Sequence, residues 1–332
     1  MKVGIVGMGK MGLTHAAVLE TLEPGCVAGA VEADRGAHGT IRSLLKAPVH
    51  ADLASLLAAG PIDAAIVSTP TFTHEKLVSE LIERGIPVLV EKPLAENLAV
   101  CARLAELAEK KKAITAVGYS IDYDPLFNEA RRLLPSLGRI TRYRAFVEHA
   151  EVFGPKQGWL FQKAKSGGGV IINPAPHMLF VLLEAFGAPK SVKAVLRSPY
   201  SGVEDEAEVD LDHGDFSGRL TASWSVKGKP NLELALYVEG EAGSLAVGND
   251  ELLIEEKGAV RSITRADLPA DGAFDLAPAA RASNYWREDR EFLDCVRRKA
   301  VPRNSIQNTL KVDTLIDAIY RAGAARTEVP WT

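Results

Sequence analysis

Two hydrophobic periods alternate along the first 120 residues. Short apolar runs, rich in β-branched residues, occupy 3–6, 26–31, 64–67, 87–90 and 114–117, as expected of strands buried on both faces. Between most of them, apolar residues recur at helical spacing, most clearly over 10–22, 75–85 and 96–112. Gly85 closes the second of these helices as a typical terminating residue. This alternation predicts βαβ units and a doubly wound parallel sheet of the Rossmann type.

The pattern changes after Tyr119. A helix is predicted over 124–134, and two more around 284–299 and 305–322. Longer strand-like segments, separated by Gly, Asn or Asp turns, lie at 139–153, 191–198, 206–213, 218–226, 232–240 and 243–248. The chain of 332 residues is long enough for two domains. We therefore expect an α/β protein with a Rossmann domain at 1–120 and an α+β domain with a large, mostly antiparallel sheet at 121–332.

The composition is that of a soluble globular protein, with 47% hydrophobic and 25% charged residues. The net charge of −4 and a pI near 6.0 argue against nucleic acid or an anionic membrane as partner. Cys26, Cys101 and Cys295 are too few and too scattered for a disulfide framework or a metal site. The chain enters an apolar strand at once, without room for a signal peptide. A cytoplasmic protein without a metal ion is expected.

The first predicted strand leads into a glycine-rich turn. Gly7, Gly9 and Gly12 match G-x-G-x-x-G between a strand and a helix, where each glycine has a separate task in dinucleotide binding. The intervening residues of this loop are Met8, Lys10 and Met11. We expect the loop and the following helix N-terminus to hold a pyrophosphate.

An acidic residue stands where a ribose would be bound. Glu32 ends the second strand, twenty residues beyond Gly12, and predicts a hydrogen bond to the adenosine ribose hydroxyls. A carboxylate there repels a 2′-phosphate, so NAD is favoured over NADP, although Arg35 lies close enough to accommodate such a phosphate.

Two further segments follow strands at the same predicted sheet edge. After the fourth strand, Ser68, Thr69 and Pro70 are candidates for cofactor contacts, while His74 has local helix packing as an equal alternative. After the fifth strand comes Glu91-Lys92-Pro93, where the proline restricts the backbone of Lys92.

The E-K-P motif, together with GMGKMG and STPTFTH, resembles the Gfo/Idh/MocA family of glucose–fructose oxidoreductase, inositol dehydrogenase and MocA proteins over essentially the whole chain. The resemblance implies that Lys92 lies between nicotinamide and substrate, with Glu91 beside the cofactor, and that the Lys92–Pro93 bond is cis. It also implies a substrate-binding second domain whose open sheet mediates a homodimer or homotetramer.

A histidine follows the unusual stretch GGGVIINPAPHM at 167–178. Asn173 is predicted as N-cap, with Pro174 at the first and Pro176 at the third helical position, and Gly187 ends the helix. His177 then lies near the positive end of the helix dipole, which favours a neutral ring able to accept a proton from a substrate hydroxyl. A capped, partly buried histidine without chemistry is the alternative.

The resemblance assigns these residues to a motif similar to D-x-G-x-H, with departures. His177 takes the histidine position, while Asn173 replaces the acid and so orients rather than removes a proton. Asp122 stands where the family often has arginine, which favours a hydroxyl-rich or cationic ligand. Trp159 could stack on a sugar or belong to the core, and Tyr285 matches a position near the substrate.

The combined prediction is an NAD-dependent oxidoreductase. It would move a hydride between nicotinamide and a secondary alcohol or ketone of a sugar, sugar derivative or cyclitol, with Lys92 and His177 as the acid–base pair. The alternatives are a non-catalytic nucleotide-sensing protein, which Asn173 leaves open, and an NAD-dependent, redox-assisted glycosidase.

Overall fold

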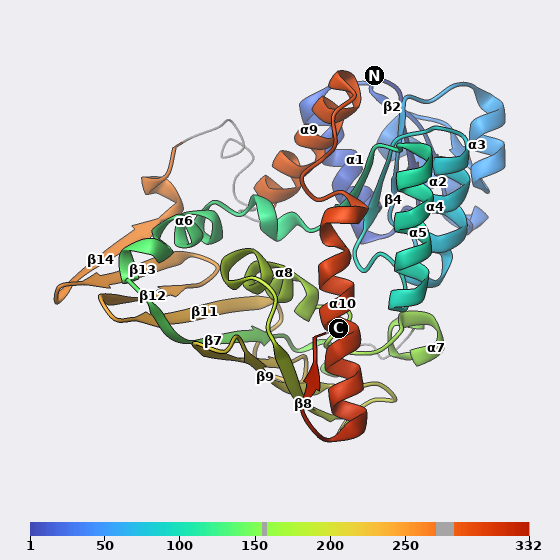
Figure 1. The fold of residues 1–332 in the computed structure, drawn as a ribbon. Helices are drawn as coiled ribbons and strands as arrows, with labels where there is room; N and C mark the ends of the chain where they lie inside the picture. The colour runs from blue at the N-terminus through green and yellow to red at the C-terminus, as the bar shows by residue number, and fades with distance from the viewer. Residues whose placement is uncertain (155–157, 270–281, 332) are drawn as a thin grey trace. The chain divides into compact units, whose positions relative to one another are not determined.

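The computed structural model describes residues 1–154, 158–269 and 282–331 (Figure 1). The chain forms two compact units. Unit 1 comprises Met1–Ala95, Ala99–Tyr123 and the described part of Asp271–Leu310. Unit 2 comprises Glu96–Leu98, the described part of Asp124–Ala270, and residues from Lys311 onward.

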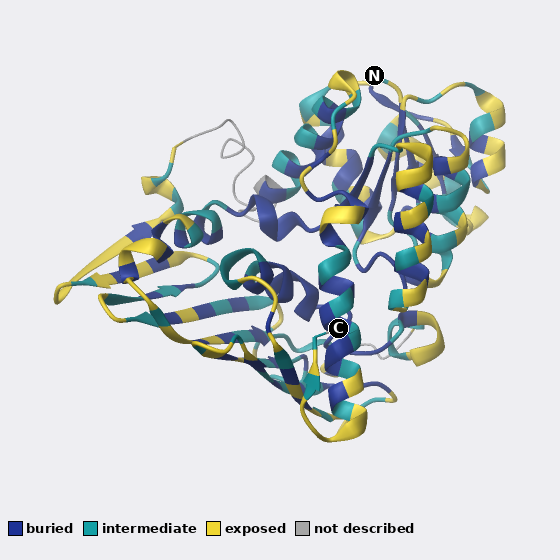
Figure 2. Cartoon of the chain, in the orientation of Figure 1, coloured by how far each residue is buried: buried dark blue, intermediate teal, exposed yellow. Residues whose placement is uncertain are grey.

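Unit 1 contains a parallel sheet in the order β3-β2-β1-β4-β5-β6. Its strands are β1 (Val3–Val6), β2 (Val27–Val31), β3 (Val49–His50), β4 (Ala64–Val67), β5 (Val88–Glu91) and β6 (Thr115–Gly118). The central strands β1, β4 and β5 are entirely buried, as their continuous apolar runs predicted (Figure 2). The strand order reverses at β1, so the predicted Rossmann sheet is confirmed.

The helices of unit 1 pack around this sheet. They are α1 (Lys10–Leu22), α2 (His38–Leu45), α3 (Leu53–Ala59), α4 (His74–Glu83), α5 (Leu98–Lys111) and α9 (Ala282–Arg298), with short 3-10 turns η1 (Arg35–Ala37), η2 (Thr71–Thr73) and η3 (Ser120–Tyr123). Phe292 and Leu293 of α9 join the core formed around Val3, Ile5 and Leu19.

The predicted division at residue 120 differs from this arrangement. The first boundary, between Tyr123 and Asp124, lies close to it, but the chain returns to unit 1 with α9. The physical reason is the apolar face of α9, which packs against α1 and η3 and joins the core of unit 1. The last helix, α10 (Ile306–Ala325), begins in unit 1 and continues into unit 2 beyond Leu310.

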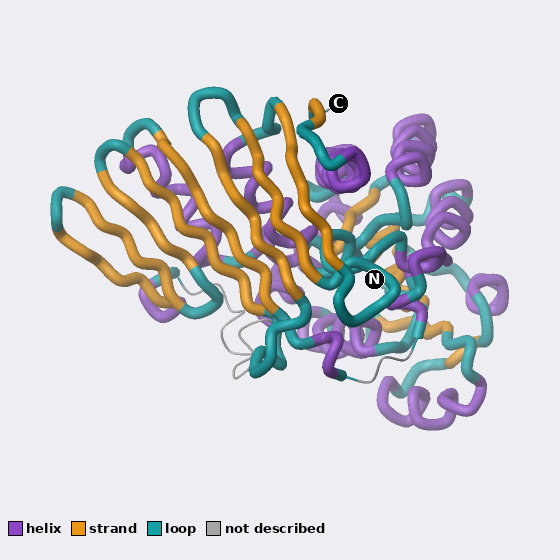
Figure 3. Tube along the Cα trace, turned by 90° about the horizontal axis from the view of Figure 1, so that it is seen from below, coloured by secondary structure: helices purple, strands orange, loops and turns teal. Residues whose placement is uncertain are grey.

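Unit 2 is built on a sheet of nine described strands in the order β14-β13-β12-β11-β7-β10-β9-β8-β15 (Figure 3). They are β7 (Ile140–Glu148), β8 (Ser191–Arg197), β9 (Glu206–Asp212), β10 (Ser217–Ser223), β11 (Glu233–Gly240), β12 (Gly243–Val247), β13 (Glu251–Glu256), β14 (Ala259–Thr264) and β15 (Val329–Pro330). Only β7 and β10 pair in parallel among them. The prediction of a large, mostly antiparallel sheet is confirmed.

One face of this sheet is covered and the other is open. Buried and less buried residues alternate along β9 and β10, so one set of side chains faces the core. The helices of unit 2 are α6 (Pro125–Leu133), α7 (Lys163–Ser166), α8 (Ala175–Phe186) and most of α10, with further 3-10 turns η4 (Leu134–Leu137), η5 (Glu151–Phe153) and η6 (Trp159–Phe161). Helix α8 packs on β7.

The glycine triplet before α8 is required by packing. A Cβ on Gly169 would lie 2.0 Å from the backbone oxygen of Glu204, and one on Gly168 would lie 1.9 Å from the Tyr320 hydroxyl. The Glu204 carboxylate accepts hydrogen bonds from the Gly169 N–H at 2.7 Å and from the Tyr320 hydroxyl at 2.6 Å. Close packing against Glu204 and Tyr320 therefore explains why positions 168 and 169 are glycine.

Helix α8 begins later than predicted. Its N-cap is Pro174, with backbone angles of −80° and −35°, and no side chain caps it, so the N-cap assignment of Asn173 is wrong. A turn over 169–175, in which the Ala175 N–H donates to the Val170 carbonyl, leads the chain directly into the helix. His177 is the third helical residue, near the N-terminal end of the helix as predicted, and Gly187 ends the helix with a φ of 74°.

Gly169→Ala should destabilise the protein by about 1–3 kcal/mol, because the added methyl group must displace backbone rather than a side-chain end. Chemical denaturation measures the free energy of unfolding. Gly39→Ala in α2 is the matched control: its Cβ meets no atom within 4 Å, so we expect no loss and up to about 1 kcal/mol of gain. Equal stability of Gly169→Ala and wild type would contradict the steric account.

Candidate functional site

The glycine loop joins β1 to α1. Gly7 has a φ of 96°, which favours glycine, and a Cβ on Gly12 would lie 1.9 Å from the Gly7 oxygen. A Cβ on Gly9 would meet no protein atom within 4 Å. The first and third glycines therefore serve the turn and the helix–strand packing. The approach of a pyrophosphate to Gly9, and contacts with Met11 and exposed Lys10 beside it, stay predictions.

The Glu32 carboxylate lies against this loop. It accepts hydrogen bonds from the backbone N–H of Met8 at 3.2 Å and of Asp34 at 2.9 Å. The His38 ring contacts the Glu32 carbonyl at 2.7 Å. The carboxylate is thus held at the carboxyl ends of β1 and β2, where a dinucleotide ribose is bound in such sheets.

The loop after β4 is anchored to its neighbours on both sides. The Ser68 hydroxyl donates to the Gly7 carbonyl at 2.8 Å, and the Thr69 and Thr73 hydroxyls are 2.6 Å apart. The buried His74 ring contacts the carbonyl oxygens of Thr69 at 2.8 Å and Pro93 at 3.1 Å. Burial lowers the pKa of His74, and the carbonyl contacts oppose this effect.

His74 therefore links the loop after β4 to the E-K-P motif. These contacts agree with the alternative expectation for His74, in which its ring packs against neighbouring parts of the chain. Direct cofactor contacts of Ser68, Thr69, Pro70 and His74 stay predictions.

The E-K-P motif ends β5. The Lys92–Pro93 peptide bond is cis, as the resemblance implied. Burial lowers the pKa of Lys92, whereas the neighbouring Glu91 carboxylate raises it. Glu91 Oε2 accepts a hydrogen bond from the Lys92 backbone N–H at 3.1 Å. A lowered pKa increases the fraction of neutral amine at a given pH, and the neutral amine is the form that can accept a proton.

Sequence reasoning missed a buried ion-pair cluster behind Glu91. His15 of α1 is fully buried; its Nδ1 lies 2.9 Å from Asp289 Oδ1 and its Nε2 lies 3.2 Å from Glu91 Oε1. Burial lowers the pKa of His15, but the two carboxylates outweigh it and hold the pKa well above the ordinary value. The available signal was a histidine among Gly12, Ala16 and Leu19, on the buried face of α1.

A second acidic residue of α9 is buried beside this cluster. Glu288 has no exposed surface, and burial together with Glu91 and Asp289 raises its pKa well above the ordinary value. Its Oε1 lies 3.4 Å from the Asn304 amide nitrogen. The raised pKa favours the protonated form of Glu288, which adds no further buried negative charge to the cluster.

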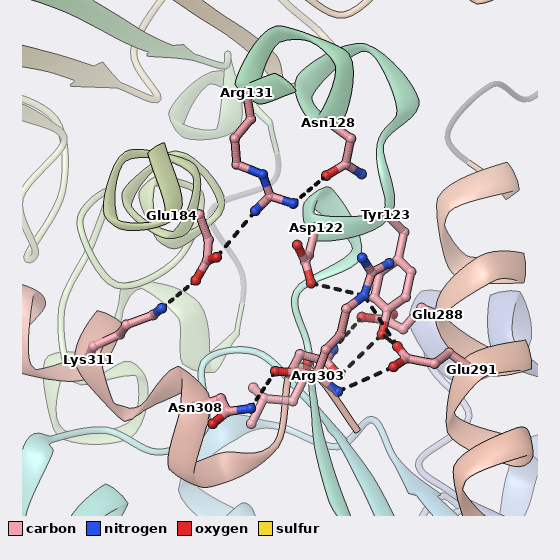
Figure 4. A network of polar contacts seen from close by, with 12 residues as sticks. Asp122, Tyr123, Asn128, Arg131, Glu184, Glu288, Glu291, Arg303, Asn308 and Lys311 are labelled. Atoms are coloured by element: carbon pink, nitrogen blue, oxygen red, sulfur yellow. Dashed lines mark hydrogen bonds and ion pairs between the residues drawn. The ribbon is translucent and has the colours of Figure 1, made fainter. Parts of the chain in front are cut away.

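Asp122 forms an ion pair within unit 1 (Figure 4). It is buried, and its Oδ2 lies 3.2 Å from Arg303 Nε. The Arg303 guanidinium stacks 3.8 Å from the centre of the Tyr123 ring and also lies 3.4 Å from Glu291. Sequence reasoning identified the acid at position 122, but the cation comes from a segment far along the chain.

The remaining predicted residues are divided between the units. Tyr285 lies on α9 in unit 1, with its ring 5.8 Å from that of His15. His177, Asn173 and Trp159 belong to unit 2, where His177 is buried and the other two are partly buried. The convergence of Lys92 and His177 stays a prediction.

Ion pairs connect α8, the helix that carries His177, to other helices of unit 2 (Figure 4). Glu184, two turns further along α8, pairs with Arg131 of α6 at 3.2 Å and with Lys311 of α10. These contacts orient α8 about its axis, and hence the face on which His177 lies.

Neither a metal centre nor a membrane span is found in the described chain. Within 1–154, 158–269 and 282–331, no group of three or more His, Cys, Asp or Glu side chains is placed to bind a metal ion. No helix in these ranges has the length and apolar character needed to cross a bilayer.

Comparison with known proteins agrees with this arrangement. A family model described as "Oxidoreductase family, NAD-binding Rossmann fold" matches residues 1–119, and the GFO/IDH/MocA C-terminal domain model matches 127–246. Inositol 2-dehydrogenase 2 of Saccharopolyspora erythraea is 37% identical over 43% of this chain and 42% of its own length. The scyllo-inositol 2-dehydrogenase (NAD(+)) of Bacillus subtilis is 25% identical over 91% of this chain and 88% of its own.

A solved structure shares the fold over the whole chain. Levoglucosan dehydrogenase in complex with NADH superimposes with a TM-score of 0.88 at 19% identity, covering 100% of this chain and 99% of the other. The chain spans about two fifths of the length of inositol 2-dehydrogenases 2 and 1 of Saccharopolyspora erythraea, 42% and 41%.

Glu288→Gln should make the protein less sensitive to alkaline pH. The raised pKa means that protonated Glu288 contributes stability below the ordinary carboxyl pKa, and that this contribution is lost as pH rises through the folded-state pKa. The unfolding free energy of the variant should fall less than that of wild type from about pH 5 to about pH 9. Glu106→Gln, which removes an exposed carboxyl of α5, controls for the loss of one acidic group. An unchanged pH slope in Glu288→Gln would refute the neutral-acid assignment.

Proposed function

The chain belongs to the Gfo/Idh/MocA oxidoreductase family, and from this premise we propose that it is an NAD-dependent dehydrogenase or reductase acting on CH–OH groups. Its substrate would be a sugar, sugar derivative or cyclitol with a secondary alcohol, or the matching ketone. The supporting observation is the E-K-P lysine, whose pKa is lowered by burial at the carboxyl edge of the Rossmann sheet.

The residues at this edge fit a dinucleotide. The turn at Gly7, the open surface at Gly9 and the start of α1 offer backbone N–H groups to a pyrophosphate. The Glu32 carboxylate would bind the ribose hydroxyls, and Ser68 and Thr69 would lie beside the nicotinamide half. The bound cofactor supplies the hydride acceptor or donor. NAD is favoured because a carboxylate at position 32 repels a 2′-phosphate.

The acid–base work falls to Lys92 and His177. In the oxidative direction, the neutral amine of Lys92 takes the proton of the substrate hydroxyl as the hydride leaves the carbinol carbon. His177 contacts the same substrate hydroxyl and passes the proton on. Asn173 orients the substrate by hydrogen bonding. In the reductive direction, the same groups return a proton to the carbonyl oxygen.

A neutral, hydroxyl-rich substrate suits the residues available. Inositol dehydrogenases are among the relatives, and the local charges agree with a polyol because Asp122 is already balanced by Arg303. Hydroxyl groups could donate to Asp122, while Trp159 and Tyr285 would contact the apolar faces of a ring.

We extend the proposal to assembly as a homodimer or homotetramer through the open face of the sheet in unit 2. Val260, Tyr237 and Leu253 are 69%, 44% and 38% exposed on strands of that face. They line a shallow hollow together with Arg144. Exposed apolar side chains grouped in this way favour a protein interface.

Lys92→Ala should lower kcat by about 10²–10⁴-fold, the usual contribution of a positioned acid–base group. The assay is NADH formation from NAD with myo-inositol, scyllo-inositol or glucose at mildly alkaline pH. Lys76→Ala, which removes a lysine on the outer side of α4, is the control and should keep the wild-type rate. Undiminished turnover in Lys92→Ala would defeat the mechanism. Nucleotide binding without any turnover would favour a sensing protein, and release of a leaving group without net NADH would favour a glycosidase.

Glu32→Ala should raise the ratio of kcat/KM for NADP to that for NAD by about tenfold or more, because a charged hydrogen bond to ribose is removed together with the repulsion of a phosphate. Asp34→Ala, two residues away, removes an acid that binds the Gly36 N–H and is the matched control. A wild-type preference for NADP would show that the role given to Glu32 is wrong.

A further inference from the structure

We propose that His15 is a positioning residue. As a positively charged imidazolium, its ring binds the Glu91 carboxylate and thereby fixes the position of Lys92. This inference rests on the role of Lys92 proposed above. His15 does not touch the reacting atoms, and it acts through Glu91.

The geometry gives both ring nitrogens a carboxylate partner. Nδ1 lies 2.9 Å and 3.0 Å from the two Asp289 oxygens, and Nε2 lies 3.2 Å from Glu91 Oε1. Each ring nitrogen thus faces a carboxylate oxygen, and only the imidazolium form can donate a hydrogen bond to both partners at once. The ring has no exposed surface, so water cannot substitute for either partner.

The other carboxylate oxygen of Glu91 reaches the backbone of the lysine. Glu91 Oε2 accepts a hydrogen bond from the Lys92 N–H at 3.1 Å. On the neighbouring strand β6, position 118 has little room for a side chain: a Cβ on Gly118 would lie 3.0 Å from this oxygen and 3.2 Å from the Glu91 Cα. Glu91 is therefore held between His15 and the Gly118 backbone, with Lys92 attached to it.

The cluster also joins three segments distant in sequence. His15 is on α1, directly after the glycine loop; Glu91 ends β5; and Asp289 is on α9, 274 residues from His15. The Tyr285 ring of α9 packs edge-on against His15 at 5.8 Å. The same interactions thus set the position of the glycine loop's helix relative to the lysine, which is what alignment of a cofactor with a base requires.

The charges around the ring are consistent with a single buried cation. Asp289 and Glu91 face it directly, and burial raises the pKa of the nearby Glu288 of α9, which favours its protonated form. Burial also raises the pKa of Asp289, and the charge of His15 opposes this effect. Removal of the positive charge would leave two acids buried with no counterion, which is strongly unfavourable unless the side chains move or take up protons. We expect Glu91 to be released from its place.

The first test does not depend on activity. Crystal structures of wild type and His15→Gln should differ at the end of β5, where the hydrogen bond from the Lys92 N–H to Glu91 should be broken in the variant. In wild type, ¹⁵N NMR of the histidine rings should show both nitrogens of His15 protonated at about pH 8, well above the ordinary titration range of histidine. Asp289→Asn, which keeps the shape but removes one charge, covers the case in which His15→Gln does not fold.

Kinetics then separate positioning from simple stabilisation. With NAD and myo-inositol or scyllo-inositol, His15→Gln should lower kcat by about tenfold to 10²-fold while KM and the Kd of NADH change less than about twofold. His50→Gln makes the same substitution on β3 of the same unit and should retain the wild-type kcat.

The outcomes distinguish the two proposals. Glu91 and Lys92 in their wild-type positions in His15→Gln, or a singly protonated His15 ring at about pH 7, would overturn this inference whatever the activity. Loss of turnover in Lys92→Ala together with a wild-type kcat in His15→Gln would also overturn it and leave the proposed function standing. Displacement of Glu91 with undiminished turnover in Lys92→Ala would instead remove the catalytic role of the lysine while keeping the interaction of His15 with Glu91.

Discussion

The register of three parallel strands determines where the glycine loop, the loop after β4 and the E-K-P motif lie. Val6 of β1 is aligned with Val67 of β4, and Val67 with Val90 of β5. The residue that follows each of them, Gly7, Ser68 or Glu91, therefore lies at the same edge of the sheet. A shift by one residue would turn each side chain to the other face and would separate the glycine loop from the lysine.

Hydrogen bonds hold the segments at these strand ends in fixed positions relative to one another. Ser68 bonds to the glycine loop, His74 bonds to the backbone of the E-K-P motif, and His15 bonds to Glu91. The first two bonds link the ends of neighbouring strands, and the third links α1 to the end of β5. The two histidines that make these contacts are buried. The groups that resemble a catalytic set are thus supported by Ser68, His74 and His15, and of these three only His15 was not identified from the sequence.

Local patterns predicted those parts of the fold in which local preference and tertiary environment agree. β1 and β4 have the predicted bounds because continuous apolar runs occur only where both sheet faces are covered. β3 has two residues, too few for a period, and β14 exposes nearly all of its side chains, so neither gave a signal. Asn173 was assigned as N-cap from propensity alone, but the turn held by Gly169 and Val170 leads the chain into α8 without a cap. His15 could not be interpreted because Asp289 lies at the other end of the chain.

The central claim is that Lys92 and His177 act on one carbinol carbon. A crystal structure of the complex with NADH and myo-inositol tests it most directly. We expect Lys92 Nζ and a His177 ring nitrogen both to lie about 3 Å from the same substrate oxygen, with the adjoining carbon facing nicotinamide C4. A polyol bound with either group turned away from that oxygen, or with the two on opposite sides of the sugar ring, would contradict the claim.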